Sequence, residues 1–116
     1  MAVNGIDHLY LESKHFDRSV EFWKTLGFDV VSEWGQGEYK ACQLKSGKAL
    51  VVLTNGGEVK PTAHFSIENA DVLAKKLEES EHVEVTTPLE DTHWGTRWIR
   101  VRDPDGNEYA LEDVGR

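Results

Sequence analysis

The side chains best suited to chemistry alternate with apolar residues along segments that we expect to form β-strands. His8 and Tyr10, for example, alternate with Leu9 and Leu11. Residues two apart project from the same face of a strand, so each strand has an apolar face and a polar or aromatic face. The second face carries His8, Tyr10 and Glu12; Tyr39, Ala41 and Gln43; Leu50, Val52 and Thr54; Thr62, His64 and Ser66; Trp98 and Arg100; and Ala110 and Glu112.

This face has two interpretations. One face of an antiparallel sheet is often simply solvated. However, Tyr10, Tyr39 and Trp98 are costly apolar surface to leave in water, and aromatic side chains with polar tips are typical of ligand pockets. Trp34 and Trp94 flank the face from predicted loops, where they either anchor the loop or stack on a ligand. From the residues alone, the solvated face is the favoured interpretation.

Other reactive residue types have simpler interpretations. His15, His82 and His93 fall at the ends of predicted elements, where we expect them on the surface. Cys42 is the single cysteine, which excludes an intrachain disulfide and a cysteine-rich metal site. Its neighbours favour a buried, inert thiol.

The elements that must position these residues follow from periodicity and turn formers. Apolar residues at helical spacing follow Asp17, a candidate N-cap, and stop at Gly27. A second helix begins near Asn69 or Asp71 and has Leu73 and Leu77 on its apolar stripe, whereas Trp23 lies on the stripe of the first helix. We expect strands over 6–12, 28–34, 38–44, 49–54, 62–67, 83–87, 97–102 and 109–113, with a tight turn over 103–106.

The order of elements repeats once. Aligning the helices places His8 opposite Thr62, an offset of 54 residues, and each half reads strand-helix-strand-strand-strand. The chain is therefore predicted to be one α+β domain over 1–116, with module one at about 5–55, a linker at 56–61 and module two at about 62–113. Such a half does not bury its helix and sheet well alone, so the two halves should pack together.

Several segments together resemble the vicinal oxygen chelate superfamily, which includes glyoxalases, bleomycin resistance proteins and extradiol dioxygenases. The segments are His8-Leu9-Tyr10-Leu11, Arg18-Ser19-Val20-Glu21-Phe22-Trp23, Leu26-Gly27-Phe28, His93-Trp94-Gly95-Thr96-Arg97 and Arg102-Asp103-Pro104-Asp105-Gly106-Asn107. The Val-Glu-Phe-Trp and Trp-Gly segments lie nearest to the bleomycin-resistance branch, whose role is antibiotic resistance. The resemblance implies two tandem βαβββ modules, mixed sheets curving around a concave groove, and a homodimer.

The resemblance also implies four positions for metal ligands, one on each of four strands. His8 fits the first position, but Val52, Thr62 and Ala110 stand at the others and cannot bind a metal. We therefore expect no metal cofactor. An alternative stays open because His64 and Glu112 each lie two residues beyond the expected position, on the same strand face. His8, His64 and Glu112 together have the composition of a two-histidine, one-carboxylate site.

Charge and length exclude several classes of partner. The 116 residues carry 13 Lys and Arg against 21 Asp and Glu, a net charge of −8, which argues against nucleic acid or an anionic membrane as partner. The longest purely apolar run, over 49–53, is far shorter than the ~20 residues of a membrane span. We see no signal peptide and expect a cytoplasmic protein.

Two functions therefore remain. The expected one is a small-molecule binding protein without catalysis, which holds an aromatic or cationic ligand in a dimer groove. Its predicted ligand-binding residues are Tyr10, Trp34, Tyr39, Trp94, Trp98, Arg100 and Glu112. The alternative is a metal-dependent lyase or dioxygenase of the glyoxalase type, with one divalent ion on His8, His64 and Glu112.

Overall fold

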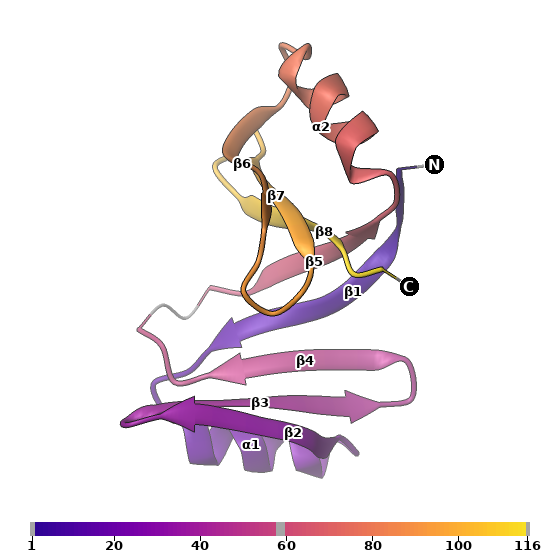
Figure 1. The fold of residues 1–116 in the computed structure, drawn as a ribbon. Helices are drawn as coiled ribbons and strands as arrows, with labels where there is room; N and C mark the ends of the chain where they lie inside the picture. Colours follow the sequence, from indigo (N-terminus) through magenta and orange to yellow (C-terminus); the bar gives the residue numbers. More distant parts are fainter. Residues whose placement is uncertain (1, 58–59, 116) are drawn as a thin grey trace. The chain divides into compact units, whose positions relative to one another are not determined.

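The computed structural model describes residues 2–57 and 60–115, which form a mixed α+β fold. One strand, β1 (Val3–Glu12), runs through two compact units (Figure 1). The N-terminal unit covers residues 8–62, and the C-terminal unit covers residues 1–7 and 63–116. The remaining elements are α1 (Phe16–Thr25), β2 (Asp29–Gln36), β3 (Tyr39–Ser46), β4 (Ala49–Thr54), β5 (Thr62–Ile67), α2 (Ala70–Glu78), β6 (Glu84–Asp91), β7 (Arg97–Arg102) and β8 (Glu108–Asp113).

In the N-terminal unit the strand order is β2-β3-β4-β1. The part of β1 that starts at His8 pairs in parallel with β4, with Tyr10 opposite Val52, while β3 pairs antiparallel with both β2 and β4. Helix α1 packs on the apolar face. Its core consists of Cys42, Leu44, Val51 and Leu53, with Leu9, Leu11, Phe16, Val20, Trp23, Phe28 and Val30 packed against them.

In the C-terminal unit the strand order is β5-β8-β7-β6, and the first residues of the chain are tied to β5. Ser66 Oγ donates to Asn4 Oδ1 over 2.6 Å, and the Glu68 N–H donates to the Ala2 carbonyl. Helix α2 contacts β6 and β7 (Figure 1). The core of this unit consists of Ile67, Ala70, Leu73, Ile99, Val101 and Leu111.

The two cores confirm the strand faces predicted from alternation. The predicted apolar pairs on β5, β7 and β8 belong to the core of the C-terminal unit, and Trp23 packs in the other core. The expected turn is also present: the Gly106 N–H donates to the Asp103 carbonyl, and Gly106 has φ +88°, which favours glycine. This turn joins β7 to β8 and so sets which of their residues lie opposite each other.

Some predicted boundaries are wrong, each for a local reason. Asp17 is not the N-cap of α1: the cap is His15, and Asp17 lies in the first turn, where a carboxylate also complements the helix dipole. The expected strand 83–87 continues to Asp91 as β6, because β7 supplies pairing partners for the extra residues. Pro88 is tolerated there because β6 is an edge strand with irregular register.

Two further expectations concern the ends of the modules and the membrane. The predicted linker at 56–61 includes Glu58 and Val59, which lie outside the described residues. The module boundaries stay a prediction. Within the described part of the chain, neither helix is long and apolar enough to cross a membrane.

Candidate functional site

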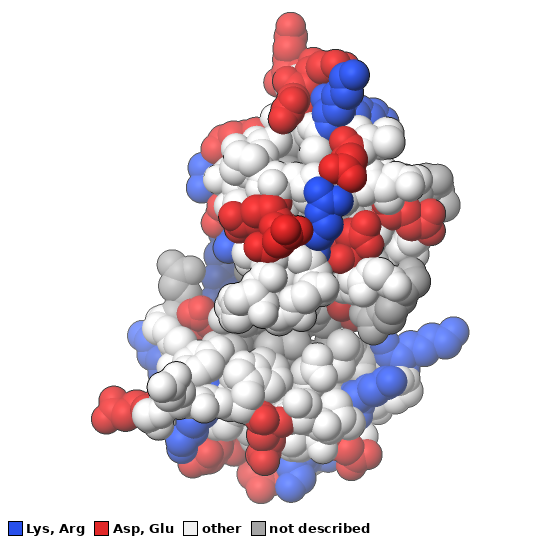
Figure 2. Space-filling model, viewed as in Figure 1, with Lys and Arg blue, Asp and Glu red and all other residues white. Residues whose placement is uncertain are grey.

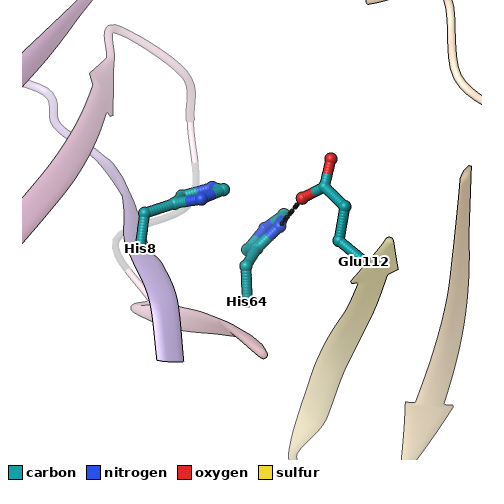
Figure 3. Close-up of side chains that lie close together, drawn as sticks. All are labelled: His8, His64 and Glu112. Atoms are coloured by element: carbon teal, nitrogen blue, oxygen red, sulfur yellow. Dashed lines mark hydrogen bonds and ion pairs between the residues drawn. The ribbon is translucent and has the colours of Figure 1, made fainter. Parts of the chain in front are cut away.

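The C-terminal unit buries a histidine–carboxylate pair on the polar face of its sheet. His64 of β5 lies opposite Ala110 of β8, and Glu112 is the next residue of β8 on the same face. Their side chains meet: His64 Nδ1 lies 3.0 Å from Glu112 Oε1 (Figure 3). His64 is 7% exposed and Glu112 2%. The prediction that these two residues share a face is therefore confirmed.

The carboxylate of Glu112 is held by three donors. Besides His64, Trp94 Nε1 and Thr96 Oγ1 each donate to Oε2 over 2.7 Å. Burial favours the neutral acid and by itself raises the pKa of Glu112, but the hydrogen bonds from His64, Thr96 and Trp94 outweigh it. The pKa of Glu112 consequently falls from 4.5 to about 2. Glu112 is an ionised carboxylate at neutral pH, although it is almost completely buried.

The ionised carboxylate determines which nitrogen of His64 carries a proton. A carboxylate without a proton only accepts hydrogen bonds, so His64 Nδ1 must be the donor. His64 Nε2 is the other ring nitrogen and takes no part in this hydrogen bond. A histidine oriented in this way by a carboxylate is the arrangement that metal sites and general bases both use.

The other two donors to Glu112, Trp94 and Thr96, come from the turn between β6 and β7. The Thr92 and Thr96 hydroxyls lie 2.8 Å apart, and the Thr96 N–H donates to Thr92 Oγ1. Thr96 therefore holds the turn closed and bonds the carboxylate at the same time. Trp94 reaches Glu112 from the tip of this turn. Sequence reasoning placed Trp94 beside the face but missed Thr96, for which the only signal is its position directly before β7.

Aromatic side chains continue the site along β7. The ring of Trp94 lies edge-on to Trp98, with centroids 5.1 Å apart, and His93 lies edge-on to Trp94. The ring centroids of Trp98 and His64 are 6.0 Å apart. The guanidinium of Arg100 lies 5.4 Å from the centroid of the Trp98 ring. Trp98, Trp94, Arg100 and Glu112, four predicted ligand-binding residues, thus lie together.

The Trp98 indole has a further partner that the sequence did not suggest. Its Nε1 donates to Glu90 Oε1 over 2.8 Å. Glu90 lies opposite Trp98 in the part of β6 that was predicted to be a loop. The predicted strand ended at residue 87, so it gave Glu90 no partner on the neighbouring strand. Glu90 was missed for this reason.

The other predicted ligand-binding residues belong to the N-terminal unit. The Tyr10 hydroxyl lies 3.3 Å from Thr54 Oγ1, and burial raises the pKa of Tyr10. The predicted loop position of Trp34 is wrong: it lies within β2 and pairs with Ala41, because the β2–β3 hairpin extends beyond it. Trp34 is 43% exposed, and Tyr39, the first residue of β3, is 46% exposed. Their role in binding stays a prediction.

The remaining histidines and the cysteine lie where the sequence placed them. His15, His82 and His93 are exposed. Cys42 is 1% exposed, and burial raises the pKa of its thiol, which keeps it protonated and unreactive.

His8 differs from the pair in its place in the fold. It is the first residue of the N-terminal unit and directly follows Asp7 on the continuous strand β1. Figure 3 draws it with His64 and Glu112. Imidazole and carboxylate are ligands that Zn, Ni, Fe and Mn accept, so the donor types of these residues fit such an ion. The ionised state of Glu112 adds to that fit, because only the carboxylate form binds a metal well.

Charge on the surface is mixed rather than segregated. On the face shown in Figure 2, Asp and Glu are interspersed with Lys and Arg, and no continuous basic area is visible. Opposite charges also pair locally: Arg97, for example, forms ion pairs with Asp71 and Asp91. This distribution is typical of a solvated surface.

The comparisons with known proteins identify the fold. The model of the Glyoxalase/Bleomycin resistance protein/Dioxygenase superfamily matches residues 5–111. A crystal structure of a member of this superfamily from Vibrio splendidus 12B01 has a TM-score of 0.77 at 19% identity, covering 91% of this chain and 96% of that one. No curated protein matches the sequence.

Two enzymes are among the similar structures. Methylmalonyl-CoA epimerase of Streptomyces coelicolor, in complex with 2-nitronate-propionyl-CoA, has a TM-score of 0.75 at 19% identity, covering 98% of this chain and 96% of its own. The Mn(II)-bound glyoxalase of Novosphingobium aromaticivorans has a TM-score of 0.72 at 16% identity, covering 97% of this chain and 40% of its own. Identities this low show a shared fold.

Proposed function

Because this chain belongs to the Glyoxalase/Bleomycin resistance protein/Dioxygenase superfamily, we propose that it is a metal-dependent enzyme of the glyoxalase or dioxygenase type. The observation that carries the proposal is the buried, ionised Glu112 bonded to His64. A buried imidazole–carboxylate pair supplies two of the ligand types that a divalent ion accepts.

The proposed ligands are His8, His64 and Glu112. His64 and Glu112 are held in the C-terminal unit as described above, and the second imidazole of the proposed set is His8 of β1, which fits the first ligand position that the family resemblance implies. A divalent ion bound there supplies Lewis acidity to a substrate with two neighbouring oxygens. In this proposal Glu112 is the carboxylate ligand in place of the residue expected at position 110, which is alanine. Glu112 lies two residues further along β8, on the same face.

The protein's own groups hold the proton and shape the site. The hydrogen bond from Nδ1 to Glu112 keeps the His64 ring in one orientation. The Trp94 and Thr96 donors fix the carboxylate, so that it does not rotate away from His64. The Trp98 ring gives the substrate an apolar wall beside His64.

Elemental analysis of protein purified without chelator tests this proposal. We expect near-stoichiometric Mn, Fe, Ni or Zn, lost in His8→Ala, His64→Ala and Glu112→Gln. His15→Ala is the matched control, since this histidine is exposed and lies outside the ligand set. Protein that contains no metal and binds none of these ions in calorimetry contradicts the proposal, as does equal loss of metal in the His15 variant.

A second candidate function is a metal-free protein that binds an aromatic ligand in the groove of a homodimer. The half-exposed Trp94, edge-on to Trp98, favours it. Stacking on such rings supplies affinity without catalysis. Fluorescence titration with bleomycin and aromatic cations, with Trp94→Ala and Trp98→Ala for comparison, tests the binding, and analytical ultracentrifugation tests the dimer. No change in tryptophan fluorescence contradicts this candidate.

A further inference from the structure

One arginine on the polar face of the C-terminal unit has no carboxylate partner among the described residues. Arg97 pairs with Asp71 and Asp91, and Arg102 pairs with Glu84 and Glu108. In the part of the chain that the structure describes, the guanidinium of Arg100, on the same strand, contacts the ring of Trp98 and no carboxylate. The chain has 21 acidic residues against 13 basic ones, so acidic partners are plentiful and their absence at Arg100 is a feature of the site.

The Arg100 side chain also contains a hydrogen-bond donor that nothing satisfies. Its Nε–H is out of contact with solvent and has no acceptor among the described residues. The hydroxyl of Thr86 is in the same condition. Thr86 lies in the irregular part of β6, beside Thr87, which is the register partner of Arg100. Leaving such groups unpaired costs free energy, so two of them at one place in the sheet indicate that something polar binds there.

The strand register puts Arg100 in the same row as His64. Ala110 of β8 lies opposite His64 on one side and opposite Arg100 on the other. Neighbouring strands are roughly 4.8 Å apart, so the backbones of His64 and Arg100 are separated by about 10 Å. The Trp98 ring borders both side chains. A molecule of a few carbon atoms spans this distance.

We propose that Arg100 binds the carboxylate of a small organic acid whose remaining atoms lie along Trp98 toward His64. This proposal rests on the proposed function for the chemistry at His64, and it adds the class of substrate. A planar guanidinium forms paired hydrogen bonds with a carboxylate, as it also does with a phosphate, and the titration below separates the two. The hydrogen-bond partners of the Glu112 carboxylate are His64, Trp94 and Thr96 rather than Arg100.

A titration of the full chain with three matched probes tests this inference. The probes are phenylacetate, the neutral phenylacetamide and phenyl phosphate, followed by tryptophan fluorescence in buffer containing EDTA. We expect phenylacetate to bind at least about tenfold more tightly than the amide, the size typical of a charged hydrogen bond. Equal binding of acid and amide overturns the proposal without any variant, and tighter binding of phenyl phosphate overturns the assignment of a carboxylate.

Variants then locate the binding group. Arg100→Gln should reduce phenylacetate binding to the level of the amide, and Arg100→Lys should restore part of it. The matched control is Arg102→Gln, which removes an arginine of the same strand that has its own acidic partners. An equal loss in both glutamine variants, or none in Arg100→Gln, contradicts the role of Arg100. Thr86→Val should weaken binding about threefold if the hydroxyl contacts the same carboxylate.

The outcome is separable from that of the proposed function. EDTA removes metal from the titration, so a preference for the acid reports Arg100 alone. If metal binds at His64 and Glu112 but acids bind no more tightly than amides, the Arg100 proposal is rejected and the proposed metal-dependent function stands. If acids bind more tightly but the protein binds no metal, the metal-dependent function is rejected and the carboxylate-binding role of Arg100 stands.

Discussion

The two units use the same pair of positions in different ways. In the N-terminal unit, Tyr10 of β1 lies opposite Val52 of β4 and bonds the next residue of that face, Thr54. In the C-terminal unit, His64 of β5 lies opposite Ala110 of β8 and bonds the next residue of that face, Glu112. Tyr10 and His64 are related by the offset of 54 residues seen in the sequence.

The difference between these pairs separates structure from chemistry. Two hydroxyls at 3.3 Å form a neutral bond that has no charge to offer a ligand. An imidazole on an ionised carboxylate at 3.0 Å holds a charge and a basic nitrogen in a buried place. The duplicated framework therefore carries a neutral contact in one unit and a contact to a charged carboxylate in the other. Arg100 sharpens the contrast, because Gln43 occupies the corresponding row of the N-terminal unit.

The largest expected effect comes from removing the charge on one side of this comparison. Glu112→Gln should lower the free energy of unfolding by about 3 kcal/mol, because hydrogen bonds to a buried carboxylate are worth roughly 1.5–3 kcal/mol each and the amide does not accept all of them. Thr54→Val, the equivalent change in the N-terminal unit, should cost about 1 kcal/mol. Urea unfolding followed by circular dichroism measures both. Equal losses would show that the two pairs are energetically the same.

Acid should weaken the C-terminal pair selectively. The folded pKa of Glu112 is about 2, below the ordinary 4.5, so its contribution is complete above pH 4.5 and is lost as the pH falls toward 2. Between pH 6 and pH 3 this amounts to about 2 kcal/mol. Urea midpoints measured over that range in EDTA should fall further in the wild type than in Glu112→Gln. Asp71 and Asp103 also have lowered pKa values, so the part of the acid-dependent loss of stability that comes from them remains in the variant. Parallel curves would contradict an ionised Glu112.

A smaller effect distinguishes the two indoles of the site. Trp94→Phe keeps an aromatic ring but removes the donor to Glu112, so we expect a loss of about 1–2 kcal/mol in unfolding free energy. Trp98→Phe removes a hydrogen bond to the exposed Glu90, and the loss of that bond should lower the free energy of unfolding by less than about 1 kcal/mol. Urea unfolding at pH 7 compares them. A larger loss in Trp98→Phe would show that ring packing, rather than the bond to the carboxylate, dominates at these positions.

Alternation and duplication were readable from the sequence because they depend on local rules. The strands over 49–54, 62–67 and 97–102 have the predicted bounds, and the face with Trp98, Arg100 and Glu112 is the predicted one. Boundaries that depend on a neighbouring strand were less accurate: the partner β7 extends β6 beyond residue 87. The helix cap was also misplaced, since several residues before α1 offer comparable local alternatives.

The sequence by itself determined the two modules, the apolar and polar faces of their strands, and the residue types available for a metal or a ligand. Periodicity is enough for this, because a side chain's face follows from its position along the strand. Only the tertiary structure decided that Glu112 bonds His64, Trp94 and Thr96 together, and that Arg100 alone among the β7 arginines has no acidic partner within residues 2–57 and 60–115. These hydrogen bonds have donor–acceptor distances of 2.7–3.0 Å, and they form only when strand register and side-chain direction bring the two atoms together. The spacing of residues along the chain encodes neither the register nor the direction.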